Sequence, residues 1–181
     1  MIINKTMSAA ALLMLVSAVS VQAQEVAGDP RITEHYVPVV SSSPAMGGFV
    51  SQLYVRERTS PGTDSRDQPN RVILFVHGAG TPAEVAFDTS AKGYSWMDYL
   101  ARRGFDTFSV DLTGYGRSTR PLQMNDRCNL SADQQQTVFG SACEATFKQG
   151  ATTLASDWDD LDAVVNYLLK LRNVATVDIV A

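Results

Sequence analysis

Long apolar runs, an excess of basic charge and abundant cysteine are all missing from this sequence of 181 residues. Lysine and arginine number 15 against 19 aspartates and glutamates, so the net charge is −4 and no basic patch suggests a nucleic-acid partner. Two cysteines and two distant histidines offer fewer ligands than a metal site usually needs, which disfavours such a site. Internal repeats are also absent, and the hydrophobic share of 45% is that of one ordinary globular domain.

The first 23 residues have the layout of a cleaved secretory signal peptide. Lys5 precedes a stretch of apolar or small side chains at residues 7–21, and Val21-Gln22-Ala23 fits a cleavage site. The unbroken apolar core of about a dozen residues is too short to span a ~30 Å hydrocarbon layer, which argues against a stable membrane anchor. We therefore expect a secreted or periplasmic protein in which residues 24–181 form the mature chain.

Cys128 and Cys143 are expected to form a disulfide in such an oxidising compartment. They lie within residues 121–150, a polar and irregular stretch that is expected to form either a surface loop or a lid-like excursion, with a short helix at most. A free catalytic thiol and a metal site are the alternative interpretations of the two cysteines.

The pattern of apolar side chains predicts an α/β fold. Strict alternation indicates antiparallel strands, continuous apolar runs indicate buried ones, and spacings of three and four residues indicate helices. A strand, a helix and a second strand at this spacing make a right-handed crossover with parallel strands. The expected elements are strands at residues 32–40, 49–58, 72–76, 105–111 and 176–181 and helices at residues 95–103 and 152–172.

Several conspicuous side chains in these elements receive ordinary structural interpretations. His35 is expected at the surface of its strand, and Trp96 in the core rather than in an acyl pocket with Tyr94. The aspartates of the long helix are expected on a solvated face, and they are Asp157, Asp159, Asp160 and Asp162. The apolar stripe of that helix is expected to comprise Leu154, Trp158, Leu161, Val165 and Leu168.

The tetrapeptide HGAG at residues 77–80 directly follows the buried strand at residues 72–76. Ligands of α/β sheets bind beyond the carboxyl ends of such strands. The segment is no dinucleotide loop, because a third glycine is absent and Pro82 disfavours the start of a helix, and no Gly-Lys-Ser/Thr follows as in a phosphate-binding loop. Bare backbone N–H groups at a strand end suit a developing oxyanion, where each donor is worth ~3–4 kcal/mol of barrier.

The order of elements, with HGAG after the third strand and DLTGYGRS after the fourth, resembles the N-terminal half of an α/β-hydrolase. The resemblance covers roughly residues 32–181. It implies that the backbone N–H of Ala79 is an oxyanion-hole donor in a loop shaped by His77, Gly78 and Gly80. It also implies a structural turn after the fourth strand, matched by Asp111, Gly114, Gly116 and Ser118.

The nucleophile of that family sits in a Gly-x-Ser-x-Gly elbow after the fifth strand, and the acid and the histidine follow later. No such elbow occurs in the sequence, so the resemblance implies catalytic residues beyond Ala181 and a chain that is inactive alone. The expected activity is that of a serine esterase or lipase-like hydrolase of small-molecule esters, with no cofactor. Alternatives are an aspartate-nucleophile dehalogenase or epoxide hydrolase, a non-catalytic binding module, and the partner of a separate C-terminal half.

Overall fold

The computed structural model describes residues 28–62, 71–89, 91, 93–147 and 149–181, and the predicted signal peptide at residues 1–23 lies outside these ranges. One five-stranded sheet has the order β1-β2-β4-β3-β5. The strands are β1 (Arg31–Val40), β2 (Val50–Thr59), β3 (Val72–Val76), β4 (Asp106–Val110) and β5 (Asp178–Val180). The helices are α1 (Ala83–Phe87), α2 (Trp96–Ala101), α3 (Ala132–Phe139) and α4 (Leu154–Arg172), with short 3-10 turns η2 (Leu122–Asn125) and η3 (Arg127–Asn129).

The strand directions confirm the predicted α/β arrangement. β1 and β2 form an antiparallel hairpin, and β2 is also antiparallel to β4. β3 runs parallel to β4 on one side and to β5 on the other. The crossover through α1 and α2 therefore joins two parallel neighbours, as the spacing of the sequence indicates. The expectation that Pro82 disfavours the start of a helix is wrong, because α1 begins directly after it and a proline at a helix start loses no intrahelical hydrogen bond.

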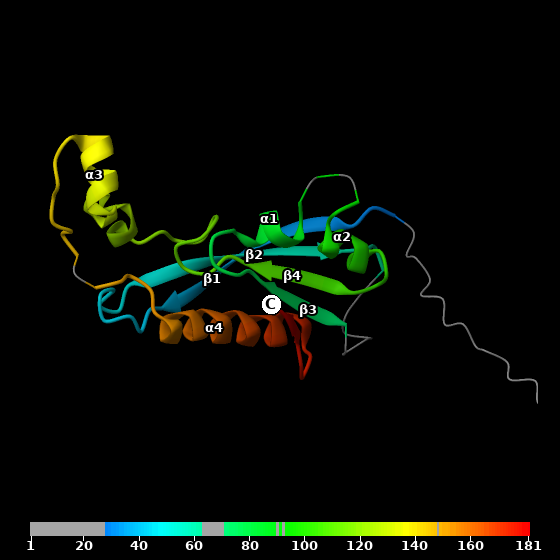
Figure 1. Cartoon of the computed structure of the whole chain (residues 1–181). Coiled ribbons are helices and arrows are strands. Elements are labelled where there is room, and N and C mark those ends of the chain that lie inside the picture. The colour runs from blue at the N-terminus through cyan, green and yellow to red at the C-terminus, as the bar shows by residue number, and fades with distance from the viewer. Residues whose placement is uncertain (1–27, 63–70, 90, 92, 148) are drawn as a thin grey trace, which may run out of the picture.

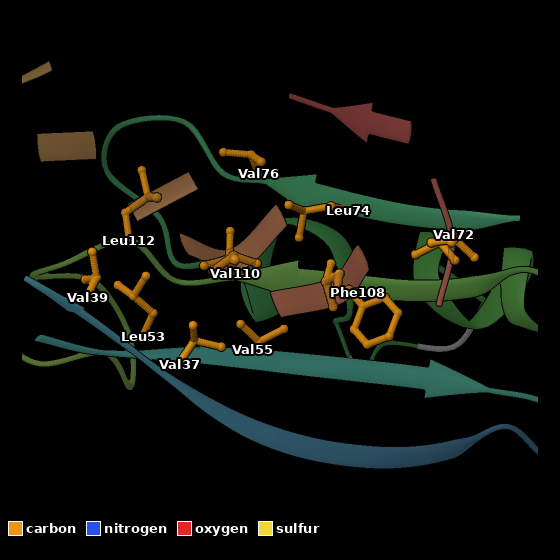
Figure 2. Close-up of a cluster of buried hydrophobic side chains, with 13 residues drawn as sticks. Val37, Val39, Leu53, Val55, Val72, Leu74, Val76, Phe108, Val110 and Leu112 are labelled. Atoms are coloured by element: carbon orange, nitrogen blue, oxygen red, sulfur yellow. The ribbon is translucent and has the colours of Figure 1, made fainter. Parts of the chain in front are cut away.

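Helices cover both faces of this sheet, with α4 on one side and α1 and α2 on the other (Figure 1). The alternation of side chains along β3 shows why both faces are apolar. Leu74 belongs to the larger core cluster, which includes Val164 and Leu168 of α4, whereas Phe75 packs in a second cluster with Met97 of α2. Figure 2 shows how the larger cluster extends along β1, β2, β3 and β4.

The apolar face of α4 is rotated from the predicted stripe. Leu168 is buried as expected, but Leu154 and Trp158 are 75% and 61% exposed. The buried positions step by four residues and are Ser156, Asp160, Val164 and Leu168. The first turns of α4 lie over the polar turn that follows β4, so their fully buried side chains are polar. From Leu161 onward the helix meets the apolar core, where the predicted Leu161 and Val165 are partly buried.

The predicted solvated face of α4 is also wrong at one residue. Asp162 is exposed, and Asp157 and Asp159 are partly buried, but Asp160 is only 2% exposed. Its carboxylate accepts a hydrogen bond from the backbone N–H of Thr113 at 2.8 Å, and this bond is the reason that a charged residue tolerates the position.

Two aromatic or imidazole side chains also differ from their predicted environments. His35 is not at the surface, because α4 covers that face of β1 and its ring bonds Glu57 and the hydroxyl of Tyr167 at 2.7 and 2.9 Å. Trp96 is not in the core and is 61% exposed, because α2 instead turns Met97 and Ala101 toward the sheet.

The excursion between β4 and α4 carries the predicted disulfide, Cys128–Cys143. Its helix α3 stands clear of the sheet (Figure 1). Gln135 of α3 is buried and joins the two ends of the disulfide loop, since its side chain donates to the Cys128 carbonyl and accepts from the Cys143 N–H. Among the helices that the structure describes, none combines the length and apolar character needed to cross a membrane.

Candidate functional site

The two glycine-containing segments of the sequence meet at one edge of the sheet. β3 and β4 are parallel neighbours, and Val76 at the end of β3 is level with Val110 at the end of β4. The HGAG loop and the turn at residues 111–118 therefore emerge side by side. The parallel pairing explains how motifs far apart in the sequence form one local structure.

The backbone of the HGAG loop is open to solvent. Gly78, Ala79 and Gly80 are all exposed, although the strand before them is fully buried. Within the described residues, the N–H of Ala79 donates to no other group of the protein. An exposed N–H at a strand end is available to an incoming acceptor atom.

The two glycines of this loop have different steric requirements. Gly80 has φ +99°, a conformation that side chains rarely adopt, so a glycine is needed for the path of the chain. Gly78 has no positive φ, and a Cβ added there would meet no atom within 4 Å. The backbone conformation therefore does not require glycine at residue 78. The missing side chain leaves open space on the exposed side of the loop.

His77 is buried and binds backbone on both sides of its ring. Its Nε2 accepts the N–H of Leu112 at 3.1 Å, and its Nδ1 lies 2.9 Å from the carbonyl oxygen of Gly78. The ring of Tyr115 packs against it with centroids 4.5 Å apart. The ring is thus placed between the loop after β3 and the turn after β4.

Asp111 ties the same two segments together through its carboxylate. Oδ1 accepts the N–H of Ala83 at the start of α1, at 2.8 Å, and Oδ2 accepts the N–H of Arg117 at 2.9 Å. The side chain is almost fully buried. A Cβ on Gly116, which has φ +46°, would lie 1.9 Å from Asp111 Oδ2, so the carboxylate fills the space that glycine leaves.

The remaining predicted turn residues anchor the turn to its surroundings. The hydroxyl of Ser118 donates to the carbonyl of Asp111 and accepts the N–H of Tyr54 in β2. Gly114 has φ +93°, and Met124 of the excursion packs directly on it. Asp111, Gly114, Gly116 and Ser118 therefore lie in one turn after β4.

Asp160 joins this site and was not predicted to do so. Its hydrogen bond to Thr113 connects α4 to the turn after β4. Burial raises the pKa of the Asp160 carboxyl, the nearby Asp157 and Asp159 add to the rise, and the bond from Thr113 opposes it. The sequence does hold a signal, because Asp160 precedes Val164 and Leu168 at intervals of four residues, which places all three on one helix face.

Two surface pockets lie near these elements without including Ala79. One of about 320 Å³ is lined by Glu84 and Asp88 on one side and by Asp111 and Arg117 on the other. Another of about 380 Å³ has aromatic walls from Tyr94, Trp96 and Tyr99. Trp96 and Tyr94 thus line one pocket, and a role of this pocket in binding an acyl group stays a prediction.

Neither histidine is arranged as a base beside a serine or cysteine nucleophile. His35 binds Glu57 and Tyr167, and His77 binds backbone only. The cysteines are joined in the disulfide. In the described part of the chain, no group of three or more His, Cys, Asp or Glu side chains could hold a metal ion.

The comparison with protein families agrees with this arrangement. The family model described as "alpha/beta hydrolase fold" matches residues 71–172, which is more than half of the chain. The matched segment runs from the residue before β3 to the last residue of α4 and so contains HGAG and the turn after β4. A comparison with curated proteins gives no match.

Proposed function

The chain belongs to the alpha/beta hydrolase fold family, and we propose that its HGAG loop forms half of the oxyanion hole of an exported ester hydrolase. The observation that carries the proposal is the N–H of the exposed residue Ala79, which has no acceptor among the described residues. Because it lies beyond the carboxyl end of β3, it is placed where ligands of α/β sheets bind.

The loop is held before any substrate arrives. His77 joins it to Leu112, and Asp111 joins its far end at Ala83 to the turn after β4. A donor that is fixed in this way stabilises charge that develops during the reaction without first having to reorganise.

The chemistry that suits this donor is attack of a nucleophile on an ester carbonyl. The nucleophile bonds to the carbonyl carbon and gives its proton to the base, while the carbonyl oxygen becomes an oxyanion that accepts the Ala79 N–H. The bond to the alcohol oxygen then breaks, and the base passes the proton to that oxygen. Water cleaves the remaining acyl intermediate in the same way, which releases the acid and restores the nucleophile.

The proposal places the nucleophile, its base and the acid beyond Ala181, as the family resemblance implies. Within the described residues, His35 and His77 both bind other groups. A serine nucleophile is the proposed form.

Export is part of the proposal and rests on two features. Residues 1–23 have the pattern of a cleaved signal peptide. The chain also has the Cys128–Cys143 disulfide, and disulfides persist mainly in oxidising compartments outside the cytosol.

The proposal is tested on protein recovered from its native host with an antibody raised against residues 28–181. We expect saturable hydrolysis of p-nitrophenyl butyrate and labelling of an active serine by a fluorophosphonate probe. Replacing Ala79 by proline removes the N–H, and we expect kcat to fall by about 100-fold or more. Ala79→Gly keeps the N–H and is the matched control, which should retain nearly the native kcat.

Residues 24–181 produced alone are the negative control and should not turn over the ester above a heat-treated sample. Turnover by this chain alone would contradict the assignment of the nucleophile to other residues. Halide release from a haloalkane, without ester hydrolysis, would indicate an aspartate nucleophile instead of a serine. If the recovered protein shows no hydrolytic activity at all, the proposal is overturned and a binding module is favoured.

A further inference from the structure

Two consecutive backbone N–H groups after β4 bind side chains from two different elements. The N–H of Leu112 donates to Nε2 of His77, at the end of β3. The N–H of Thr113 donates to Oδ2 of Asp160, in α4. Because the two donors are adjacent in the chain, the position of one constrains the position of the other.

The bond from Leu112 determines which nitrogen of His77 carries the proton. A ring nitrogen that accepts an N–H has no proton of its own, so Nε2 is unprotonated. The proton is then on Nδ1, which donates to the carbonyl oxygen of Gly78 at 2.9 Å. In this tautomer the ring links the turn after β4 to the peptide that precedes Ala79.

The bond from Thr113 leaves little freedom in that turn. Thr113 is buried, and among the described groups Asp160 is the acceptor of its N–H. Removing the carboxylate would leave a buried donor unpaired, which the turn could relieve only by moving its backbone. The Thr113 hydroxyl donates to Ser51 of β2 at 2.8 Å, and the Thr113 side chain also helps to lower the pKa of Asp160.

We propose that Asp160 is a positioning residue for the oxyanion loop, acting through the turn after β4 and the ring of His77. The proposal rests on the proposed function, because it concerns the loop that carries Ala79. Helix α4 thereby sets the direction of a backbone N–H that it does not touch. No contact between Asp160 and substrate is involved.

The tautomer of His77 gives a direct measurement, since the chain has only two histidines. In residues 24–181 labelled with ¹⁵N-histidine, we expect NMR at mildly alkaline pH to show His77 with its proton on Nδ1. In Asp160→Ala, the His77 resonances should move toward a mixture of tautomers. Exchange of the Leu112 and Thr113 amide protons should become about tenfold faster or more.

Two further variants separate positioning from simple loss of stability. In Asp160→Asn the amide oxygen can accept the same hydrogen bond from Thr113. This variant should therefore keep the native His77 tautomer. Asp162→Ala removes an exposed carboxylate from the same helix and should change nothing. A residue that only stabilised the fold would lower the melting temperature and leave the His77 tautomer of the folded protein unchanged.

An unchanged His77 tautomer in folded Asp160→Ala would overturn the proposal. If that variant does not fold, Asp160→Leu is measured instead, because leucine fills the volume but offers no acceptor. The same shift of the His77 resonances toward a mixture of tautomers is expected. The measurement needs no substrate, so failure of the ester assay leaves it standing. Equally, an unchanged tautomer would not contradict the proposed hydrolase function.

Discussion

At the scale of single residues, Asp111 connects the two segments of the candidate site. It follows β4 directly, and its two carboxylate oxygens accept N–H groups from the start of α1 and from the turn at Arg117. Such charge-assisted bonds to backbone are stronger than bonds between neutral groups. The close approach is possible only because Gly116 carries no side chain on that side.

Gly116→Ala should therefore be strongly destabilising. The added Cβ would lie 1.9 Å from Asp111 Oδ2, and the residue would also keep its φ of +46°. We expect the free energy of unfolding to fall by about 3 kcal/mol, as overpacking and the left-handed backbone add together. Urea denaturation of residues 24–181 measures this change.

Gly47→Ala is the matched control for that substitution. Gly47 has a similar φ of +55°, but nothing lies within 4 Å of its added Cβ. Only the backbone strain remains, and we expect a loss of about 1 kcal/mol. Equal losses in the two variants would show that contact with Asp111 does not determine the need for Gly116.

At the scale of elements, α4 is defined by its two ends and by one face. Thr153 and Ser156 form a reciprocal capping box at its start, and Asn173 ends it with φ +52°. Its core contacts come from Val164 and Leu168, which are fully buried. The exposed apolar side chains of its first turns contribute little to the fold.

Truncation along α4 should reflect this division. We expect Leu168→Ala to lower the free energy of unfolding by about 3 kcal/mol, because it leaves a cavity in the core. Leu154→Ala removes the same atoms from a side chain that is 75% exposed and should cost less than about 0.5 kcal/mol. Chemical denaturation of the two variants measures both values, and similar losses would contradict the buried face described for α4.

At the scale of the whole molecule, one buried polar network joins three strands to α4. Glu57 of β2 binds His35 of β1, and it shares the guanidinium of Arg172 with Asp106 of β4. The hydroxyl of Tyr167 completes the network on the other side of the His35 ring. Its members are far apart in the sequence, so the network exists only when the sheet and α4 are both in place.

Glu57→Gln should remove a pH-dependent part of the stability. Burial disfavours the charge, but the hydrogen bond from His35 and the charge of Arg172 outweigh it, so the pKa of Glu57 is lowered below 4.5. The ionised carboxylate thus stabilises the folded state fully above the pKa of the unfolded chain, and this contribution is lost as pH falls through the lower folded pKa. Near neutral pH we expect a loss of about 3 kcal/mol.

Denaturant titrations across the acidic range check this dependence. The difference in unfolding free energy between the native chain and Glu57→Gln should shrink as the pH falls. Glu144→Gln changes an exposed glutamate of the excursion and should follow the native curve. A difference that is independent of pH would argue against a lowered pKa.

Patterns in the amino-acid sequence are enough to predict the strands, the long helix, the parallel crossover, the disulfide and the place of the HGAG loop. These features follow from short-range patterns. A fully apolar run such as residues 72–76 can be satisfied only by a strand that is covered on both faces. The turn at Asp111 and Gly116 likewise keeps its residues within a few positions of one another.

Which side of each helix meets the sheet depends on how the elements pack in three dimensions. Trp96 and Trp158 have helical spacing to apolar neighbours, yet both are exposed, because the axis of a helix relative to the sheet is set by contacts distant in the chain. The same contacts partly cover His35 with α4 and bring Asp160 to the N–H of Thr113. Periodicity describes the faces of a helix, but burial depends on what lies opposite each face, and that is fixed only when all elements pack together.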